Sequence, residues 1–282
     1  MISFDSSQRL LIFGGPYSNL PATEALRGEA ERLAIPPHNI ICTGDIIAYA
    51  AEPEQTSDLI RNWGIHVIAG NCEEQLAAGA ENCGCGFEEG SVCDMLSRGW
   101  YPYALANTSQ ATRDWMAALP AALSFAFAGK ICHVLHGGSR QTNRFIFQSE
   151  PDAIADEAAS TGADIIFAGH AGLPFVAPTN NATWINTGVI GLPANDGTPD
   201  GWFALIDADA GTIRVALRRL GYDYKAAAAA MRRSGHANGY ARAMITGIWP
   251  SHDILPAAEL SMTGSRLRQR TIRLAREPEP TA

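Results

Sequence analysis

The sequence predicts an α/β protein, and two observations carry that prediction. Short apolar runs alternate with amphipathic stretches through the first two-thirds of the chain, a pattern typical of largely parallel strands that helices cover on both faces. Later in the chain, apolar runs follow one another without a helix between them. These late strands favour a second sheet that packs on the first.

The individual elements can be placed in chain order. Strands are expected over residues 9–15, 39–45, 65–71, 130–138 and 163–170, and helices over residues 22–35, 52–64, 108–120 and 150–162. Pro36 and Pro37 end the first of these helices, and Pro120 ends the third. The late strands are expected over residues 182–188, 201–209 and 211–220, paired as in a meander or hairpin.

The character of the chain changes after residue 220. An alanine-rich helix is expected over residues 222–235 and a second helix over residues 238–249. We therefore expect residues 1–220 to form the main domain and residues 221–282 to form a C-terminal helical extension with a basic tail, packed on the same domain.

The basic tail covers residues 265–276 and contains no acidic residue. Its five arginines are Arg266, Arg268, Arg270, Arg273 and Arg276. Such a segment can bind nucleic acid or an acidic surface, but a solvated edge strand or a frayed end is the commoner outcome. Residues 277–282 are expected to be disordered.

Composition limits the functional classes. The chain has 282 residues, 46% of them hydrophobic, which is enough for one large core. A net charge of −8 argues against nucleic acid as a main partner. We see no uncharged apolar stretch of about 18 residues and no targeting signal, so we expect a cytoplasmic protein that does not bind membranes. Assembly into a homo-oligomer stays open.

Polar side chains follow four of the early strands, each beside a glycine. They are Asp45, Asn71, His136 and His170. Because the carboxyl ends of parallel strands lie along one edge of a sheet, we expect these four side chains to converge. A carboxylate, an amide oxygen and two imidazoles suit a divalent transition metal such as Mn, Fe, Zn or Ni. The alternative is that each is a satisfied polar residue with no ligand.

The first strand–turn–helix junction looks different. Leu10 to Phe13 are apolar, and Gly14, Gly15, Pro16 and Tyr17 follow. Junctions of this kind are where α/β proteins usually carry their chemistry, yet this one offers no acid, histidine or lysine.

Six short segments, in this order, resemble the motifs of one known family. They are YSNLPATEAL, GDIIAYAAEP, GNCEEQL, LHGGS, GHAGLPF and NTGVIGLP. The chain resembles the calcineurin-like metallophosphoesterases, in particular their small bacterial and archaeal phosphatases and phosphodiesterases, over residues 8 to 235. The resemblance implies a four-layer α/β/β/α sandwich and a pair of metal ions that share one bridging aspartate.

The chain departs from that family at one of the two metal positions. The resemblance implies that one ion takes its ligands from Asp45, Asn71, His136 and His170, all of suitable type. The other ion would need Asp45 together with ligands at the positions of Gly15, Tyr17 and Gly172, where the usual residues are gone. We therefore expect one ion, with the second uncertain. Tyr17 either binds a ferric ion as a phenolate or fills the space.

The cysteines raise a separate question. All six are expected to be reduced, with Cys42 and Cys132 in the core. Cys72 stands where the resemblance places a catalytic histidine. Cys83, Cys85 and Cys93 follow in a glycine-rich segment, and together with Cys72 they could supply soft metal ligands. The alternatives are a small lid with buried thiols and a transient disulfide.

These features favour a metal-dependent phosphoric ester hydrolase that acts on a small phosphate ester or phosphodiester. We expect its catalytic residues to be Asp45, Cys72, His136 and Arg144. Arg144 either grips phosphate oxygens or has a role at the surface. Two alternatives stay open. One is an impaired relative that binds a phosphate-containing ligand or senses metal or redox state, and the other is a different metal-catalysed reaction on the same scaffold. Most of the six tryptophans are expected to anchor the core; they are Trp63, Trp100, Trp115, Trp184, Trp202 and Trp249.

Overall fold

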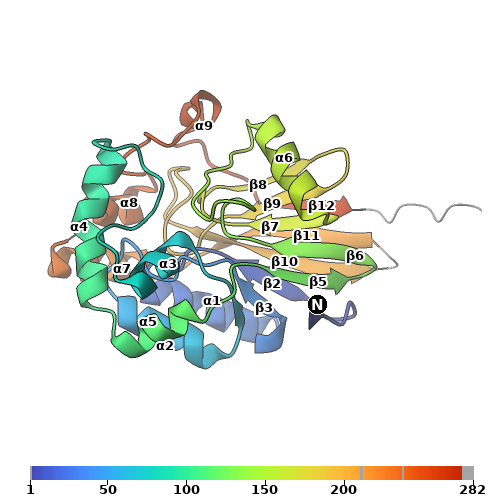
Figure 1. Cartoon of the computed structure of the whole chain (residues 1–282), viewed down its shortest axis with the longest axis horizontal. Coiled ribbons are helices and arrows are strands. Elements are labelled where there is room, and N and C mark those ends of the chain that lie inside the picture. Colours follow the sequence, from blue (N-terminus) through green and yellow to red (C-terminus); the bar gives the residue numbers. More distant parts are fainter. Residues whose placement is uncertain (1, 210–211, 237, 275–282) are drawn as a thin grey trace, which may run out of the picture.

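The computed structural model describes residues 2–209, 212–236 and 238–274. Two six-stranded sheets lie face to face, and helices cover their outer faces (Figure 1). One sheet has the order β12-β11-β10-β2-β3-β4 and consists of β2 (Leu10–Phe13), β3 (Ile40–Cys42), β4 (His66–Val67), β10 (Gly201–Asp209), β11 (Thr212–Leu220) and β12 (Arg270–Leu274). The other has the order β1-β5-β6-β7-β9-β8 and consists of β1 (Ile2–Ser3), β5 (Leu123–Phe127), β6 (Lys130–Val134), β7 (Ile165–Ala168), β8 (Pro174–Pro178) and β9 (Thr183–Thr187).

The helices are distributed unevenly around the two sheets. They are α1 (Leu20–Arg32), α2 (Pro53–Trp63), α3 (Asn71–Ala78), α4 (Val92–Ala106), α5 (Gln110–Ala117), α6 (Pro151–Thr161), α7 (Tyr224–Ser234), α8 (Asn238–Thr246) and α9 (Ala257–Ser261), with a short 3₁₀ turn at Pro37–Asn39. Most of them gather on the side of the β2 sheet, whereas α6 covers the sheet that contains β7 (Figure 1).

Apolar cores fill the three spaces between these layers. They arise because successive side chains along a strand point to opposite faces of its sheet. In β2, Leu10 and Ile12 face the core between the sheets, while Leu11 and Phe13 face the helices. Ile166 of β7 belongs to the third core, under α6. Each central strand is therefore buried on both faces, and the predicted four-layer α/β/β/α sandwich is confirmed.

The distribution of parallel strands differs from the expectation. Both sheets are mixed: β2, β3 and β4 run parallel in one, and β6, β7 and β9 run parallel in the other. The strands that precede the predicted ligands therefore belong to two sheets rather than one. Apolar alternation predicts a strand and its buried faces, but it does not identify the sheet that the strand joins.

The C-terminal part of the chain adds an edge strand to the sheet that contains β2. After α7 and α8, which pack together and against the main body, the chain forms α9 and then β12, which pairs with β11. Part of the basic segment is thus an edge strand. Arg276 and residues 277–282 lie outside the described residues, and the division at residue 220 stays a prediction.

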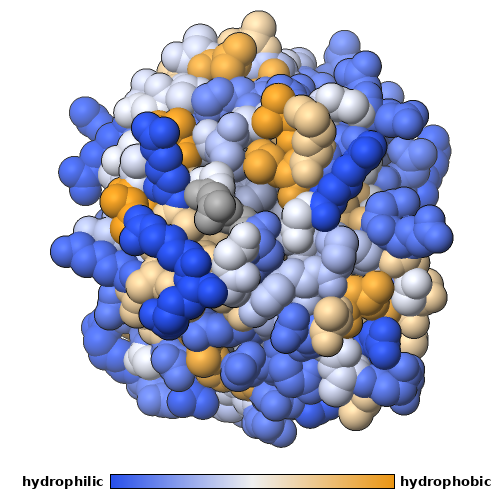
Figure 2. All heavy atoms as spheres, turned by 90° about the vertical axis from the view of Figure 1, so that its left-hand side faces the viewer, coloured by the Kyte–Doolittle hydropathy of each residue, from blue (hydrophilic) through white to orange (hydrophobic). Residues whose placement is uncertain are grey.

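The surface over α4 and α8 is mixed. Figure 2 shows this side of the molecule as mainly hydrophilic, with separate small apolar patches. The large exposed apolar side chains described on these two helices are Val92, Met95 and Ile245. Within the described part of the chain, none of the helices has the length and apolarity needed to cross a membrane.

Substitutions at two exposed glycines, Gly28 and Gly64, test how the backbone conformation at each position affects stability. Gly28 lies on the exposed face of α1, where an added Cβ meets nothing within 4 Å. We expect Gly28→Ala to raise the free energy of unfolding by about 1 kcal/mol, because alanine loses less backbone entropy in a helix. Gly64 also has open space but has a φ of 75° at the end of α2, so Gly64→Ala should lower that free energy. Urea unfolding of both variants measures the difference, and equal shifts would contradict it.

Candidate metal centre

The carboxyl ends of strands from both sheets meet at one place. Asp45 follows β3 and Asn71 follows β4, while His136 follows β6 and His170 follows β7. The two halves are joined by a hydrogen bond of 2.7 Å between His136 Nδ1 and the Thr43 carbonyl. This bond places the proton on Nδ1 and leaves Nε2 as the donor atom for a cation.

Three of the predicted ligands form one buried group. Asp45 Oδ2 lies 3.2 Å from His136 Nε2, which lies 3.2 Å from His170 Nδ1. One possible ligand atom from each residue lies within 4.8 Å of the others, and all three residues are buried. A carboxylate and two imidazoles at this spacing match the donor set of a Mn, Fe or Zn site.

Two buried polar atoms here lack a partner among the described residues. They are His170 Nε2 and Asn71 Oδ1. The amide nitrogen of Asn71 donates to the Cys83 carbonyl at 3.0 Å, so the oxygen is the free end of this side chain. Buried polar atoms without partners are costly. A bound cation is one partner that such an atom can take, and the donor types present fit a metal ion.

Two of the ligand-bearing residues have an unusual backbone. Asp45 and His170 both have a φ of 56°, in the left-handed region that non-glycine residues rarely adopt. Such conformations concentrate at functional sites, where the surrounding structure enforces them. Gly70 supplies room for this arrangement, because an added Cβ would lie 2.8 Å from His136 Cε1.

Burial and mutual charge set the protonation of the group. Burial, and then the neighbouring His136, lower the pKa of His170 to about 3, so its imidazole is neutral and able to bind a metal. Burial lowers the pKa of His136, but the Asp45 carboxylate raises it more, and the net direction is upward. Burial likewise raises the pKa of Asp45, but His136 outweighs it and the pKa is lowered.

Glu73 is a structural residue of this site that the sequence did not predict. Its side chain is completely buried. Oε2 accepts hydrogen bonds from the backbone N–H groups of Asp45 (2.7 Å) and Gly70 (2.8 Å), and Oε1 accepts one from Ile46 (2.8 Å). Burial, and then the charge of Asp45, raise the pKa of Glu73 to about 7. One carboxylate thus fixes the backbone on which Asp45 and Asn71 stand.

Aromatic and apolar side chains lie over Gly15 and Gly172, the glycines at which the resemblance would place ligands of a second ion. A Cβ on Gly15 would meet Tyr17 Cζ and Val189 Cγ1, each at 2.6 Å, and one on Gly172 would lie 3.2 Å from Trp249 Cζ2. Burial, and then the charge of Asp45, raise the pKa of Tyr17 well above its usual value, which disfavours a phenolate. Of the two roles expected for Tyr17, the structure supports filling the space.

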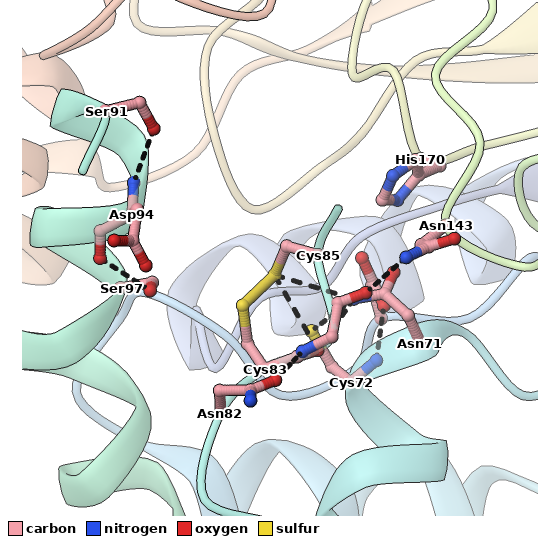
Figure 3. The surroundings of a disulfide bond; sticks show 12 residues. Asn71, Cys72, Asn82, Cys83, Cys85, Ser91, Asp94, Ser97, Asn143 and His170 are labelled. Atoms are coloured by element: carbon pink, nitrogen blue, oxygen red, sulfur yellow. Dashed lines mark hydrogen bonds between the residues drawn. A yellow bond between two sulfur atoms is a disulfide. The ribbon is translucent and has the colours of Figure 1, made fainter. Parts of the chain in front are cut away.

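The cysteines do not form the soft ligand set considered from the sequence. Cys83 and Cys85 are joined by a disulfide, so the expectation that all six cysteines are reduced is wrong for this pair, and neither sulfur offers a thiolate while the bond is intact. Asn71 lies against this disulfide, and its Nδ2 is 3.5 Å from Cys85 Sγ (Figure 3). A disulfide in this segment was one of the alternatives, but the sequence spacing did not reveal which sulfurs are bonded.

The remaining two cysteines of the cluster, Cys72 and Cys93, are buried and free. Burial, and then the charges of Asp45 and Glu73, raise the pKa of Cys72 well above its usual value. Its thiol is therefore neutral, and it does not replace a cationic histidine. Its backbone N–H donates to Asp45 Oδ1 at 3.2 Å, which orients the carboxylate.

Arg144 forms an ion pair with α6. Its guanidinium is 2.5 Å from the buried Glu157 of α6, and Glu157 also accepts a hydrogen bond from the backbone of Ser139 at 2.6 Å. This ion pair holds the loop after β6 onto α6, while the role of Arg144 in gripping phosphate stays a prediction.

Comparisons with known proteins agree with this geometry. Residues 19–211 match the model of the calcineurin-like phosphoesterase superfamily domain. An uncharacterized protein of Methanocaldococcus jannaschii is 25% identical over 228 residues, which cover 75% of this chain and 86% of that protein.

Two solved structures share the fold. A metallophosphoesterase from Sphaerobacter thermophilus superposes with a TM-score of 0.67 at 21% identity, covering 86% of this chain and 100% of that one. A hypothetical protein from Pyrococcus horikoshii OT3 superposes with a TM-score of 0.70 at 15% identity, covering 86% and 99%.

The role of Glu73 can be tested with a matched pair of variants. Glu73→Gln keeps the size of the side chain but turns an amide N–H₂ toward backbone donors. We expect the free energy of unfolding to fall by about 3 kcal/mol. Glu74→Gln makes the same change on the exposed neighbour and should stay within about 0.5 kcal/mol of the wild type. Urea unfolding measures both, and similar losses would show that Glu73 is not a structural anchor.

The low pKa of His170 predicts acid sensitivity of the metal-free protein. Because His170 is neutral when folded and has a pKa of about 6.5 when unfolded, the unfolded state binds more protons below that pH. Stability should therefore fall progressively as the pH drops from about 6.5 toward 3. Thermal unfolding against pH should show a shallower fall for His170→Gln, whereas the exposed His38→Gln should follow the wild type. A wild-type slope in His170→Gln would refute the assignment.

Proposed function

Because this chain belongs to the calcineurin-like phosphoesterase superfamily, we propose that it is a metal-dependent phosphoric ester hydrolase that works with one divalent ion. The observation that supports this most directly is the buried Asp45–His136–His170 group with two unpartnered ligand atoms beside it. The substrate is a small phosphate ester or phosphodiester. A single intact site beside a filled one favours one ion of Mn, Fe, Zn or Ni.

Each residue of the group has a defined task in this proposal. Asp45, His136 and His170, together with Asn71 Oδ1, would hold the ion, which when bound would supply Lewis acidity toward a phosphoryl oxygen. The Thr43 carbonyl fixes the tautomer of His136. The buried neutral imidazole of His170 needs no deprotonation before it binds. Glu73 keeps the Asp45 and Asn71 backbones at the required separation.

The loss of the second ion has a chemical cost. The leaving oxygen has no second cation, and the neutral Cys72 thiol stands where a protonated histidine would help. Transition-state charge on that oxygen is therefore less well stabilised, by an amount on the order of a few kcal/mol. Substrates with good leaving groups should be hydrolysed best.

A second candidate is a protein that binds a phosphate-containing ligand or senses metal or redox state without hydrolysis. Two observations favour it. The second metal position is filled by Tyr17, Val189 and Trp249, and the Cys83–Cys85 disulfide contacts the predicted ligand Asn71.

The experiment combines metal analysis with a hydrolysis assay on matched histidine variants. His136 and His133 lie three residues apart, but His133 binds Ser124 at 2.8 Å outside the metal group. We expect about one equivalent of metal in the wild type and in His133→Ala, and none in His136→Ala. Hydrolysis of a chromogenic phosphodiester with added Mn, Fe, Zn or Ni should fall more than about 100-fold in His136→Ala, since even partners of metal ligands contribute about 10- to 100-fold.

The outcomes separate the two candidates. Metal-dependent turnover that is lost with His136 supports the hydrolase. One bound equivalent without turnover on any phosphate ester supports the binding or sensing protein. Two equivalents of metal, or full activity in His136→Ala, would overturn the single-ion site itself.

A further inference from the structure

A small cavity, with an accessible volume of about 50 Å³, opens onto the metal group. Asp45 and His170 lie on its wall, so a molecule in the cavity is next to the proposed ion. Aromatic and aliphatic side chains form most of the remaining wall, among them Trp249, Phe145 and Phe87.

Trp249 occupies the place that a ligand of a second ion would need. A Cβ on Gly172 would lie 3.2 and 3.4 Å from Trp249 Cζ2 and Cη2. The edge of the indole therefore covers this glycine, and a histidine at position 172 would collide with it. The second metal position has been replaced by an aromatic surface.

The ring of Trp249 is held in place from several sides. Its Nε1–H donates to the Pro193 carbonyl at 2.7 Å, and its backbone N–H donates to Asn195 Oδ1 at 2.9 Å. A few residues later, Asp253 accepts a hydrogen bond of 2.6 Å from the N–H of Val92 at the start of α4. The indole is thus preorganised, which lowers the entropic cost of binding against it.

A second aromatic surface begins at the metal group itself. The ring of Phe145 stacks on His170, with centroids 4.2 Å apart, and Phe87 stacks on Phe145 at 6.1 Å. Phe145 and Trp249 also belong to the same apolar cluster. Aromatic surface therefore extends from a metal ligand out into the cavity.

The charge of the cavity restricts its ligand. Among the described residues that line it, none is Lys or Arg, and the acidic side chain is Asp45. A phosphomonoester dianion would have the proposed ion as its only cationic partner here, since none of these lining residues is a lysine or arginine that could share the second negative charge. A phosphodiester carries a single negative charge, and its second ester group can lie against the apolar wall.

From these observations we propose that the cavity accepts a phosphodiester with a planar aromatic ester group, and that Trp249 selects this group by stacking. The proposal rests on the proposed hydrolase for its catalytic readout, but it makes a separate statement about binding. Trp249 is then a specificity-determining residue contributed by the segment after α8.

The catalytic test uses two substrates with the same leaving group. Bis(p-nitrophenyl) phosphate and methyl p-nitrophenyl phosphate both release p-nitrophenolate, and they differ in the group that stays on phosphorus. We expect Trp249→Leu to lower the ratio of their kcat/KM values by about five- to tenfold relative to the wild type. Intrinsic reactivity cancels in this comparison. Trp115→Leu, at a half-buried tryptophan of α5 outside the cavity, should leave the ratio unchanged.

A binding test does not require turnover. Calorimetric titration of the metal-loaded full chain with diphenyl phosphate and with dimethyl phosphate should show at least about tenfold tighter binding of the diphenyl compound. That preference should be lost in Trp249→Leu and retained in Trp115→Leu. Phe145→Leu provides a second variant in case Trp249→Leu fails to fold, and it should weaken the same preference.

The outcomes distinguish this inference from the proposed function. Aromatic preference in binding that depends on Trp249 supports the inference even if no ester is hydrolysed. Equal binding of the two phosphates, or a preference that neither Trp249→Leu nor Phe145→Leu reduces, overturns it even if hydrolysis is observed.

Discussion

One buried carboxylate holds the centre of this protein together. Glu73 has no contact with solvent, and its two oxygens accept backbone hydrogen bonds from the turn after β3 and from the turn after β4. Without it, at least three buried N–H groups would lack a partner, and the two turns would lose their common anchor. The left-handed backbone at Asp45 is maintained by this arrangement. The metal group therefore depends on a residue that does not belong to it.

The sequence predicted the fold and most of the metal group for the same physical reason. Apolar runs that end in glycine and a polar residue mark the carboxyl ends of buried parallel strands, and Asp45, His136 and His170 do meet there. It did not predict that these strands belong to two sheets, because hydrophobic alternation contains no information about strand partners. The strands β5 and β8 and the helix α4 were also missed, the last because Gly99 and Pro102 weaken its helical pattern.

Other residues were missed because their type has a commoner role elsewhere. Glu73 is the third residue of α3, where an acidic side chain is usually solvent-exposed and favourable for the helix dipole. Tryptophan most often anchors a hydrophobic core, and this was the role expected for Trp249. Its short distance from Gly172, which the sequence does not give, shows that the indole covers that glycine. Pairing of Cys83 with Cys85 is likewise a matter of geometry that spacing alone leaves undetermined.

The location of Trp249 in the chain has a consequence for comparing relatives. The family model matches residues 19–211, a range that includes every proposed metal ligand but ends well before this tryptophan. Two relatives can therefore agree at each coordinating position and still accept different esters, because the wall that sorts them comes from a part of the chain that the shared domain does not include. In this architecture the metal-binding residues and the residues that select the substrate can therefore change independently of one another.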